Sequence, residues 1–308
     1  MIINDDRRKA LFFIEQQTPN TSVIHKVKRV IHSERTKYQQ LDIIETYDYG
    51  VCLILDGKVQ SSLVDEWIYH EALVHPAMVT HPKPERVLII GGGEGGVARE
   101  ALKHNTVKEA LMVDIDEGVI NASKKYLNEL HQGAFNDPRL KLFIADGREF
   151  LKTQPDSTFD VVIVDVTDPL EGGPSYLLYT KEFYGILYRK LKEDGVMVTQ
   201  ATSTFYSPLC STSIYATINS IFPYSRPYQA WIASYHSTWG FTIGSKKYDP
   251  LELSEDVIEE RLRERRVKGL RFYTAHLHKA IFVLPKYLIE SLSKGRIIAD
   301  DQPVFMPA

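Results

Sequence analysis

The chain has 308 residues, of which 44% are hydrophobic and 25% charged, with a formal net charge of −3 and a pI near 6.4. This composition is typical of a globular protein with a full core, and it lacks the overall basic charge that draws proteins to nucleic acid or anionic membranes. Cys52 and Cys210 form no CxxC motif, so neither a disulfide framework nor a structural zinc site is predicted.

The first ten residues are rich in charge and contain no apolar run, which argues against a secretion signal. The charged residues there are Asp5, Asp6, Arg7, Arg8 and Lys9. No later window approaches the length of apolar sequence that a membrane helix needs. We therefore expect a cytoplasmic protein that binds neither membrane nor nucleic acid.

Two β-rich runs, Gln40–Tyr47 and Val51–Leu55, lie close together in the first part of the chain. Turn residues separate them and follow them, as in antiparallel β-hairpins. The prolines of His81-Pro82-Lys83-Pro84 are typical of a domain joint. These features predict a small antiparallel β domain over residues 1–82 and a second domain over residues 83–308.

The second domain alternates buried strands with amphipathic helices such as Val97–His104. This order predicts a Rossmann-like, doubly wound, mostly parallel sheet with helices on both faces, as in class I methyltransferases. The predicted strands are Arg86–Ile90, Glu109–Asp114, Leu140–Ile144, Asp160–Val164 and Val196–Gln200.

The remainder of the second domain gives weaker patterns. Phe241–Ser245 is expected to add an edge strand, and Ser254–Arg265 to form a charged helix. Ile281–Ser293 has a mixed pattern, and we expect a helical C-terminal tail without recognisable chemistry.

A glycine-rich turn joins the first predicted strand of this domain to its helix. The segment Gly91–Gly96 matches the G-x-G-x-x-G pattern through Gly91, Gly93 and Gly96. Acidic residues Asp114 and Asp116 end the next strand, about 20 residues on, where such folds hold a ribose diol. The alternative is a purely structural turn, but the strand, turn and helix context favours a nucleoside site.

Glu94 within this turn indicates which nucleoside is bound. In dinucleotide-binding proteins the phosphates of the ligand lie at the N-terminus of the corresponding helix. A carboxylate there would repel phosphates but could hold a cation. The simpler alternative is that Glu94 only complements the helix dipole. Asp146-Gly147 follows the third strand, where enzymes that use S-adenosylmethionine hold the adenine amino group; the alternative is an ordinary Asp-Gly turn.

A second acidic group follows the fourth strand. Asp165, Asp168 and Glu171 stand at the carboxyl edge of the sheet, where open α/β sheets bind ligands. Clustered carboxylates at the end of an apolar strand need a cationic partner, although a solvated loop could also contain them.

These motifs together resemble the spermidine synthase family, the polyamine aminopropyltransferases. The resemblance runs in one order over roughly residues 36–245, through Lys37-Tyr38-Gln39, Leu55-Asp56-Gly57, Asp65–Glu71, Gly91–Gly96, Val113–Asp116, Ala145-Asp146-Gly147 and Asp165–Pro169. It implies transfer of an aminopropyl group from decarboxylated S-adenosylmethionine, a co-substrate, to a polyamine, with release of methylthioadenosine. It implies no tightly bound cofactor, and no metal site is predicted.

The resemblance also assigns roles to individual residues. Asp165 takes the amine proton and Tyr69 holds the nitrogen in line, while Asp168 and Tyr235 bind the acceptor. Gln39 and His70 contact the donor, and Asp114 takes the ribose hydroxyls. Without the resemblance, Tyr69 and His70 could be ordinary helix residues, Gln39 a surface residue and Tyr235 part of a core. Family members are commonly homodimers or homotetramers.

The acceptor loop departs from the common family pattern. The segment Pro169–Thr180 is longer than usual and resembles thermospermine synthases and related enzymes of thermophiles, and the later segment Tyr235–Gly240 also departs from the family pattern. Glu171 adds a negative charge suited to a longer amine, so we expect spermidine as acceptor, giving thermospermine or a related tetraamine. Putrescine and agmatine remain alternative acceptors.

Three other functions share parts of these patterns. A small-molecule methyltransferase would share the frame and the adenosine site, but its donor keeps a carboxylate. A non-catalytic polyamine or nucleoside sensor would need only the pocket. A nicotinamide dehydrogenase is disfavoured by Glu94 and by the missing phosphate site.

Overall fold

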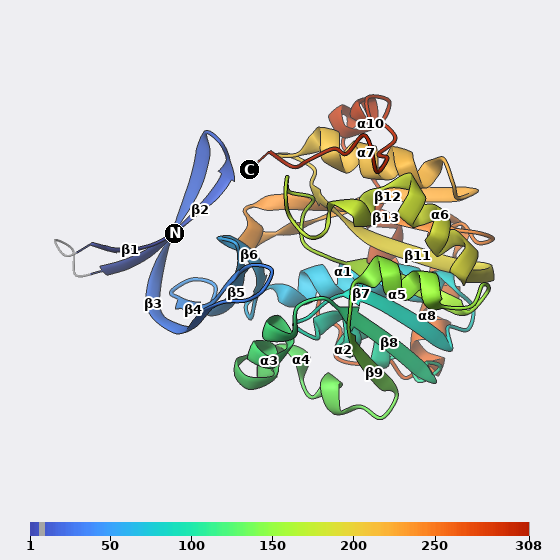
Figure 1. Cartoon of the computed structure of the whole chain (residues 1–308). Coiled ribbons are helices and arrows are strands. Elements are labelled where there is room, and N and C mark those ends of the chain that lie inside the picture. The colour runs from blue at the N-terminus through green and yellow to red at the C-terminus, as the bar shows by residue number, and fades with distance from the viewer. Residues whose placement is uncertain (6–9, 308) are drawn as a thin grey trace.

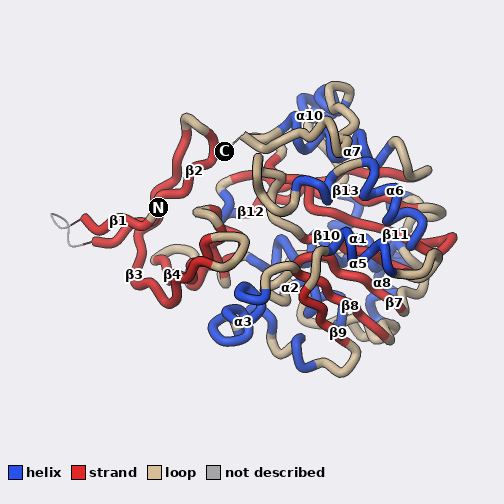
Figure 2. The backbone as a smooth tube through the Cα atoms, in the orientation of Figure 1, coloured by secondary structure: helices blue, strands red, loops and turns tan. Residues whose placement is uncertain are grey.

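The computed structural model describes residues 1–5 and 10–307, which form two β-sheets with helices around the second (Figure 1). Most of the charged N-terminal segment, residues 6–9, lies outside the described residues. Figure 2 shows that the first sheet carries few helices, whereas helices lie on both sides of the second. Among the described residues, no helix is both long and apolar enough to cross a membrane.

The first sheet is antiparallel, with its 6 strands in chain order. The predicted pair is confirmed as β4 and β5, but the sequence did not reveal the strands on either side. β3 is mostly exposed and rich in charged residues, so it lacks the apolar alternation that marks a half-buried strand. The strands are β1 (Ile2–Asp5), β2 (Ala10–Thr18), β3 (Thr21–Arg35), β4 (Gln40–Thr46), β5 (Val51–Leu55) and β6 (Lys58–Ser62).

The second sheet has 7 strands in the order β12-β13-β11-β10-β7-β8-β9. Strands β11, β10, β7, β8 and β9 are parallel, which confirms the Rossmann-like prediction. Strand β13 runs antiparallel to both of its neighbours, β11 and β12. The bounds are β7 (Arg86–Gly91), β8 (Glu109–Asp114), β9 (Leu140–Ile144), β10 (Phe159–Asp165), β11 (Leu191–Ser203), β12 (Tyr224–Ile232) and β13 (Ser237–Ser245).

One strand prediction is wrong in position. Phe241–Ser245 belongs to β13, which lies inside the sheet, and the edge strand is β12. The sequence concealed β12 because Pro227 interrupts its pattern, and a proline is tolerated in a sheet mainly on an edge strand.

Alternate residues of the central strands face opposite helical layers. Val87 and Ile89 of β7 pack with α1 and α2, whereas Leu88 and Ile90 pack with α5, α6 and α7. The helices are α1 (Glu66–Thr80), α2 (Gly96–Leu102), α3 (Glu117–Tyr126), α4 (Asn128–His131), α5 (Gly147–Thr153), α6 (Lys181–Lys190), α7 (Pro208–Asn219), α8 (Glu255–Glu264), α9 (Ala275–Ile281) and α10 (Lys286–Leu292). The charged helix at Ser254–Arg265 is found as α8.

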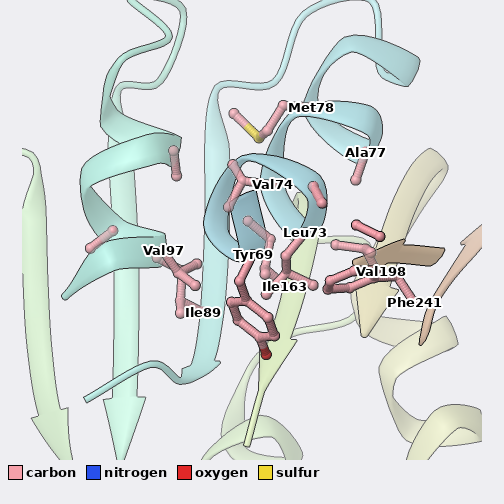
Figure 3. Packing of buried hydrophobic residues seen from close by; sticks show 14 of the residues in the cluster. Tyr69, Leu73, Val74, Ala77, Met78, Ile89, Val97, Ile163, Val198 and Phe241 are labelled. Carbon is pink, nitrogen blue, oxygen red and sulfur yellow. The ribbon is translucent and has the colours of Figure 1, made fainter. Parts of the chain in front are cut away.

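Helix α1 lies over the centre of the second sheet. Figure 3 shows its apolar side chains above Ile163, Val198 and Phe241. Pro76 within α1 has no N–H to donate to the carbonyl of Ala72, and the Tyr228 hydroxyl of β12 donates to that carbonyl instead, at 2.8 Å. Strand β12 therefore supplies the hydrogen bond that the proline removes from the helix.

The change from the first sheet to the second lies before α1. The first sheet ends at Ser62, and α1 contacts α2, β11 and β12 of the second domain. Helix α1 thus packs with the second sheet although it precedes the boundary expected at residue 82, and the prolines there follow the end of α1. An apolar cluster of β4, β5, α3 and α4 residues packs the first sheet against helices of the second domain.

Candidate active site

A cavity of about 110 Å³ opens where β7, β8 and β10 end, the edge at which open α/β sheets bind ligands. The first sheet closes one side through residues that include Gln39, Leu55 and Gln60. Most of the residues predicted for the site line this cavity: Gln39, Tyr69, Gly91, Gly93, Glu94, Asp114, Asp146, Gly147, Asp165, Asp168 and Tyr235.

The glycine loop brings the backbone of β7 against β10. Gly91 has a φ of 84°, and a Cβ there would lie 2.0 Å from the carbonyl oxygen of Asp165, so only glycine fits. The Gly92 N–H donates to the same carbonyl at 2.8 Å. A Cβ on Gly93 would lie 2.8 Å from Oδ2 of Asp114. The glycines thus allow the loop to approach the backbone of Asp165 and the carboxylate of Asp114 closely.

Glu94 is held at the cavity wall by a buried histidine. His70 Nε2 lies 2.8 Å from Glu94 Oε1, and His70 Nδ1 lies 2.6 Å from Glu66 Oε2. Burial alone would lower the pKa of His70, but the two carboxylates outweigh it and raise the pKa to about 10. His70 is therefore an imidazolium that donates to both carboxylates.

His70 does not line the cavity, contrary to the expected direct contact with the donor. It is fully buried behind Glu94, and both of its ring nitrogens contact carboxylates. In this arrangement His70 can influence the cavity only through Glu94.

An ion-pair network continues below the loop. Arg99 donates to both oxygens of Glu66, at 2.9 and 2.7 Å, and to Glu100 at 2.7 Å. His75 lies 2.8 Å from the second oxygen of Glu100. Buried charges are stable only when paired, and here every carboxylate has a cationic neighbour.

Asp165 and Tyr69 meet at the centre of the cavity. The Tyr69 hydroxyl donates to Asp165 Oδ1 at 2.5 Å. Burial, together with the charge of Glu94, raises the pKa of Asp165 to about 7, although His70 and Tyr69 act in the opposite direction. Burial also raises the pKa of Tyr69, which keeps its proton for donation. A carboxyl group with a pKa near neutrality is suited to proton transfer.

His70, Glu94 and Asp165 each place one potential ligand atom within 4.8 Å of the others, a spacing that could also hold a metal ion. However, both His70 nitrogens carry protons for their carboxylate partners, so neither has a lone pair for a metal. The two carboxylates are therefore better suited to an organic cation.

The nucleoside side of the cavity carries Asp114 and Asp146. Burial raises the pKa of Asp114 to about 6. Asp146 caps α5 by accepting from the Arg148 and Glu149 N–H groups. Asp116, expected beside Asp114, lies outside the cavity: it caps α3 and accepts from Thr36.

Gln39 reaches this side of the cavity from the first sheet. Its Nε2 donates to Asp116 Oδ2 at 2.9 Å, and its side chain is buried. Asp116 thus positions Gln39, which the sequence alone would have left as a surface residue.

The acceptor side is formed by Asp168 and aromatic residues. Burial raises the pKa of Asp168 to about 6. Gln200 Nε2 donates to Asp168 Oδ1 at 3.3 Å, and Gln200 Oε1 accepts from Trp239 Nε1 at 3.1 Å. The Tyr235 hydroxyl donates to the carbonyl of Gln60.

Glu171 is exposed and does not line the cavity, contrary to the expectation that it faces the acceptor. A turn closed by the Gly173 N–H and the Leu170 carbonyl, at 3.0 Å, carries Glu171 to the surface. Its charge therefore gives no support to a longer acceptor.

Sequence reasoning missed Gln200, Trp239 and the Glu66–Arg99 pair. Gln200 could have been found, because it lies near the carboxyl end of β11, at the same sheet edge as Asp165. Glu66 stands four residues before His70, a spacing that places the two on one helix face. Trp239 gave no signal, because its contact with Gln200 depends on how β13 pairs with β11.

Comparison with known proteins gives matches along most of the chain. Residues 66–254 match the spermine/spermidine synthase domain, and residues 11–62 match the spermidine synthase tetramerisation domain. A polyamine aminopropyltransferase of Sulfurisphaera tokodaii is 44% identical over 296 residues, covering 96% of this chain and 98% of the relative. One of Pyrobaculum calidifontis is 46% identical over 274 residues, covering 88% and 94%.

Solved structures agree with the sequence relatives. Spermidine synthase from Thermotoga maritima has a TM-score of 0.85 and 37% identity, covering 92% of this chain and 94% of that one. A spermidine synthase in complex with the transition state analogue AdoDATO has a TM-score of 0.87 and 38% identity, covering 92% and 95%. With the fold, the cavity and its carboxylates, these matches show that the chain belongs to the spermine/spermidine synthase family and is an aminopropyltransferase.

Proposed function

We propose that the chain transfers the aminopropyl group of decarboxylated S-adenosylmethionine to an amine of a polyamine, releasing methylthioadenosine and a proton. The observation that carries this proposal is the pair Glu94 and Asp165, two carboxylates at the cavity wall beside the glycine loop. The complex of a related spermidine synthase with AdoDATO supports it. The donor is a co-substrate, not a bound cofactor.

The donor is a dication in this proposal, with a sulfonium and a free ammonium. Its adenosine occupies the side of Asp114, Asp146 and Gln39, beside the backbone of Gly91, Gly93 and Gly147, which lines the cavity. Glu94 binds the ammonium of the donor. In S-adenosylmethionine a carboxylate stands beside this ammonium, and Glu94 would repel that carboxylate. A carboxylate of the protein at this position therefore favours a donor that has lost its own carboxylate.

The acceptor amine attacks the donor carbon next to the sulfonium. A C–N bond forms as the C–S bond breaks, and the sulfur keeps the bonding electron pair in neutral methylthioadenosine. Asp165 takes the proton that the nitrogen loses, and Tyr69 orients both groups. Because a carboxylate is a weak base for an ammonium, alignment and electrostatic attraction contribute more than proton affinity.

Asp168 and Tyr235 bind the rest of the acceptor, with Gln200 holding Asp168 in place. We propose spermidine as the acceptor, giving thermospermine or a related tetraamine. The resemblance of the segment Pro169–Thr180 to thermospermine synthases supports this choice, whereas Glu171 does not.

Product analysis by mass spectrometry tests both the proposed reaction and the proposed acceptor. The protein is given decarboxylated S-adenosylmethionine with putrescine, agmatine and spermidine in competition. We expect methylthioadenosine release and fastest consumption of spermidine. Faster consumption of putrescine or agmatine would overturn the acceptor, and no methylthioadenosine release with any amine would overturn the reaction.

Calorimetry separates this function from methyl transfer. We expect decarboxylated S-adenosylmethionine to bind more tightly than S-adenosylmethionine. The opposite order would favour a small-molecule methyltransferase.

We further propose a homodimer or homotetramer that works in the cytoplasm. The match of residues 11–62 to a tetramerisation domain supports the assembly, as do the exposed apolar side chains Ile24, Val30 and Tyr47 of that sheet. The two cysteines are free and buried, which suits a reducing compartment.

A further inference from the structure

The acceptor side of the cavity depends on one loop, residues 168–180, which joins β10 to α6 and is called the acceptor loop below. It begins with Asp168 and also brings Pro174, Ser175 and Leu178 to the cavity wall. Apart from the turn Tyr176–Tyr179, it contains no regular secondary structure. The position of its ends and of this turn therefore decides the shape of the acceptor site.

The C-terminal tail, residues 296–307, contacts the acceptor loop where the loop ends. Asp300 Oδ1 accepts from the Thr180 hydroxyl at 2.7 Å, and the same carboxylate pairs with both terminal nitrogens of Arg148 at 2.9 and 2.7 Å. The Ile298 carbonyl accepts from the Lys181 N–H at 2.8 Å. Because Thr180 caps α6, this contact fixes both the loop end and the helix start.

The tail contacts the loop again where the loop begins. The Met306 N–H donates to the Pro169 carbonyl at 2.9 Å, one residue from Asp168. The Phe305 ring lies against the ring of Tyr176, with centroids 5.7 Å apart. Three points of the loop, at its start, in its turn and at its end, are therefore held by one segment of the tail.

The tail is itself fixed to a rigid element. The Thr217 hydroxyl of α7 accepts from the Ile298 N–H at 2.9 Å, and the Ser213 hydroxyl accepts from the Arg296 N–H at 3.0 Å. Val304 and Met306 are buried, and Val304 packs in the core of the second domain. Figure 1 shows the end of the chain running past α7. The tail thus connects the acceptor loop to a helix packed on the central sheet.

We propose that the C-terminal tail is a positioning segment of the acceptor site, holding the acceptor loop, and with it Asp168, where the acceptor amine binds. This inference rests on the proposed aminopropyl transfer. Loss of the contacts costs binding energy because the acceptor must then order the loop itself. On the donor side, β7, β8 and the first sheet have no part in these contacts, and only the Asp300–Arg148 pair reaches α5, which follows Asp146. Loss of the contacts at Met306 should therefore leave donor binding unchanged.

The sharpest test removes a single hydrogen bond. Met306→Pro removes the N–H that the Pro169 carbonyl accepts, whereas the matched control Met306→Ala keeps the N–H and loses only the side chain. We expect the acceptor KM of Met306→Pro to rise about tenfold above that of Met306→Ala, the effect of one buried hydrogen bond. The Kd for methylthioadenosine should be the same in both.

A second pair of variants tests the other end of the loop without a backbone change. Asp300→Ala removes the contacts with Thr180 and Arg148, and the control Asp301→Ala removes the adjacent exposed carboxylate. We expect a raised acceptor KM for Asp300→Ala alone, with circular dichroism confirming that each variant is folded.

Equal acceptor KM values within both pairs would overturn the proposal, as would a matching loss of methylthioadenosine affinity, which indicates general destabilisation. The wild-type protein separates this failure from that of the proposed function. If wild type releases methylthioadenosine and the variants match their controls, only the role of the tail is wrong. If wild type is inactive with every amine, aminopropyl transfer is wrong.

Discussion

In the proposed function, the choice of donor depends on Glu94. The sequence showed a carboxylate in a turn that usually faces phosphate, and the structure adds how that charge is fixed. A protonated His70 holds one oxygen, while Glu66 and Arg99 complete a buried network behind it. The carboxylate is thereby held in one position, so it can discriminate between ligands by charge.

Glu94→Gln should therefore weaken binding of the decarboxylated donor but not of methylthioadenosine, which lacks the ammonium. We expect an affinity loss of about ten- to hundredfold for the donor, typical of a lost charged hydrogen bond. Calorimetry with both ligands measures it. Glu171→Gln, at an exposed carboxylate, should change neither, and equal losses for the two ligands would contradict the role of Glu94.

The raised pKa of Asp165 leads us to expect that the reaction rate depends on pH. Only its carboxylate form accepts a proton, and its pKa is raised to about 7 by burial and Glu94. The rate should therefore fall as the pH drops through about 7, by about tenfold per unit below it. Since Glu94 raises this pKa, Glu94→Gln should move the bend in kcat/KM to lower pH. If the bend in the pH profile of kcat/KM does not move, it reports the titration of another group, such as the acceptor amine.

At the scale of elements, the parallel strands were predictable because each is a short apolar run next to turn residues. β3 and β12 were not, since charged residues in one and Pro227 in the other conceal their pairing. Most site residues were found because they follow strands that end at the same edge. His70 and Glu171 were misplaced, because the direction of a side chain depends on partners such as Glu66 that lie elsewhere in space.

The glycine loop gives a stability prediction. Gly91→Ala places a Cβ against the Asp165 carbonyl in a left-handed conformation, and it should destabilise the fold by more than about 2 kcal/mol. Gly172 has a similar φ of 75° but open space around it, so Gly172→Ala should cost only about 1 kcal/mol. Urea denaturation compares the two, and equal losses would show that the close approach is unimportant.

For the whole molecule, the site exists only where the two sheets meet. Gln39 reaches the cavity from the first sheet, and the apolar cluster shared by β4, β5, α3 and α4 holds that sheet in place. The sequence predicted both units but not this docking, because the cluster joins residues far apart in the chain. The outer face of the first sheet remains available for assembly.

Ile24 lies on that sheet and is 63% exposed. If the sheet mediates assembly, Ile24→Asp should lower the molar mass measured by light scattering, because a charge in an apolar interface is strongly unfavourable. Val283→Asp, at a residue 76% exposed in the second domain, is the control and should leave the mass unchanged. An unchanged mass for Ile24→Asp would exclude this part of the sheet from the interface.

The hydrogen bond from Tyr228 to the Ala72 carbonyl makes Pro76 and Tyr228 dependent on each other, although they lie in different elements. A protein that acquired Pro76 before Tyr228 would have had an unpaired Ala72 carbonyl in its core. A protein that acquired Tyr228 first would have kept this carbonyl paired throughout. The accessible evolutionary route therefore runs through the tyrosine. Among descendants that keep the proline, a change to phenylalanine at position 228 should be rare.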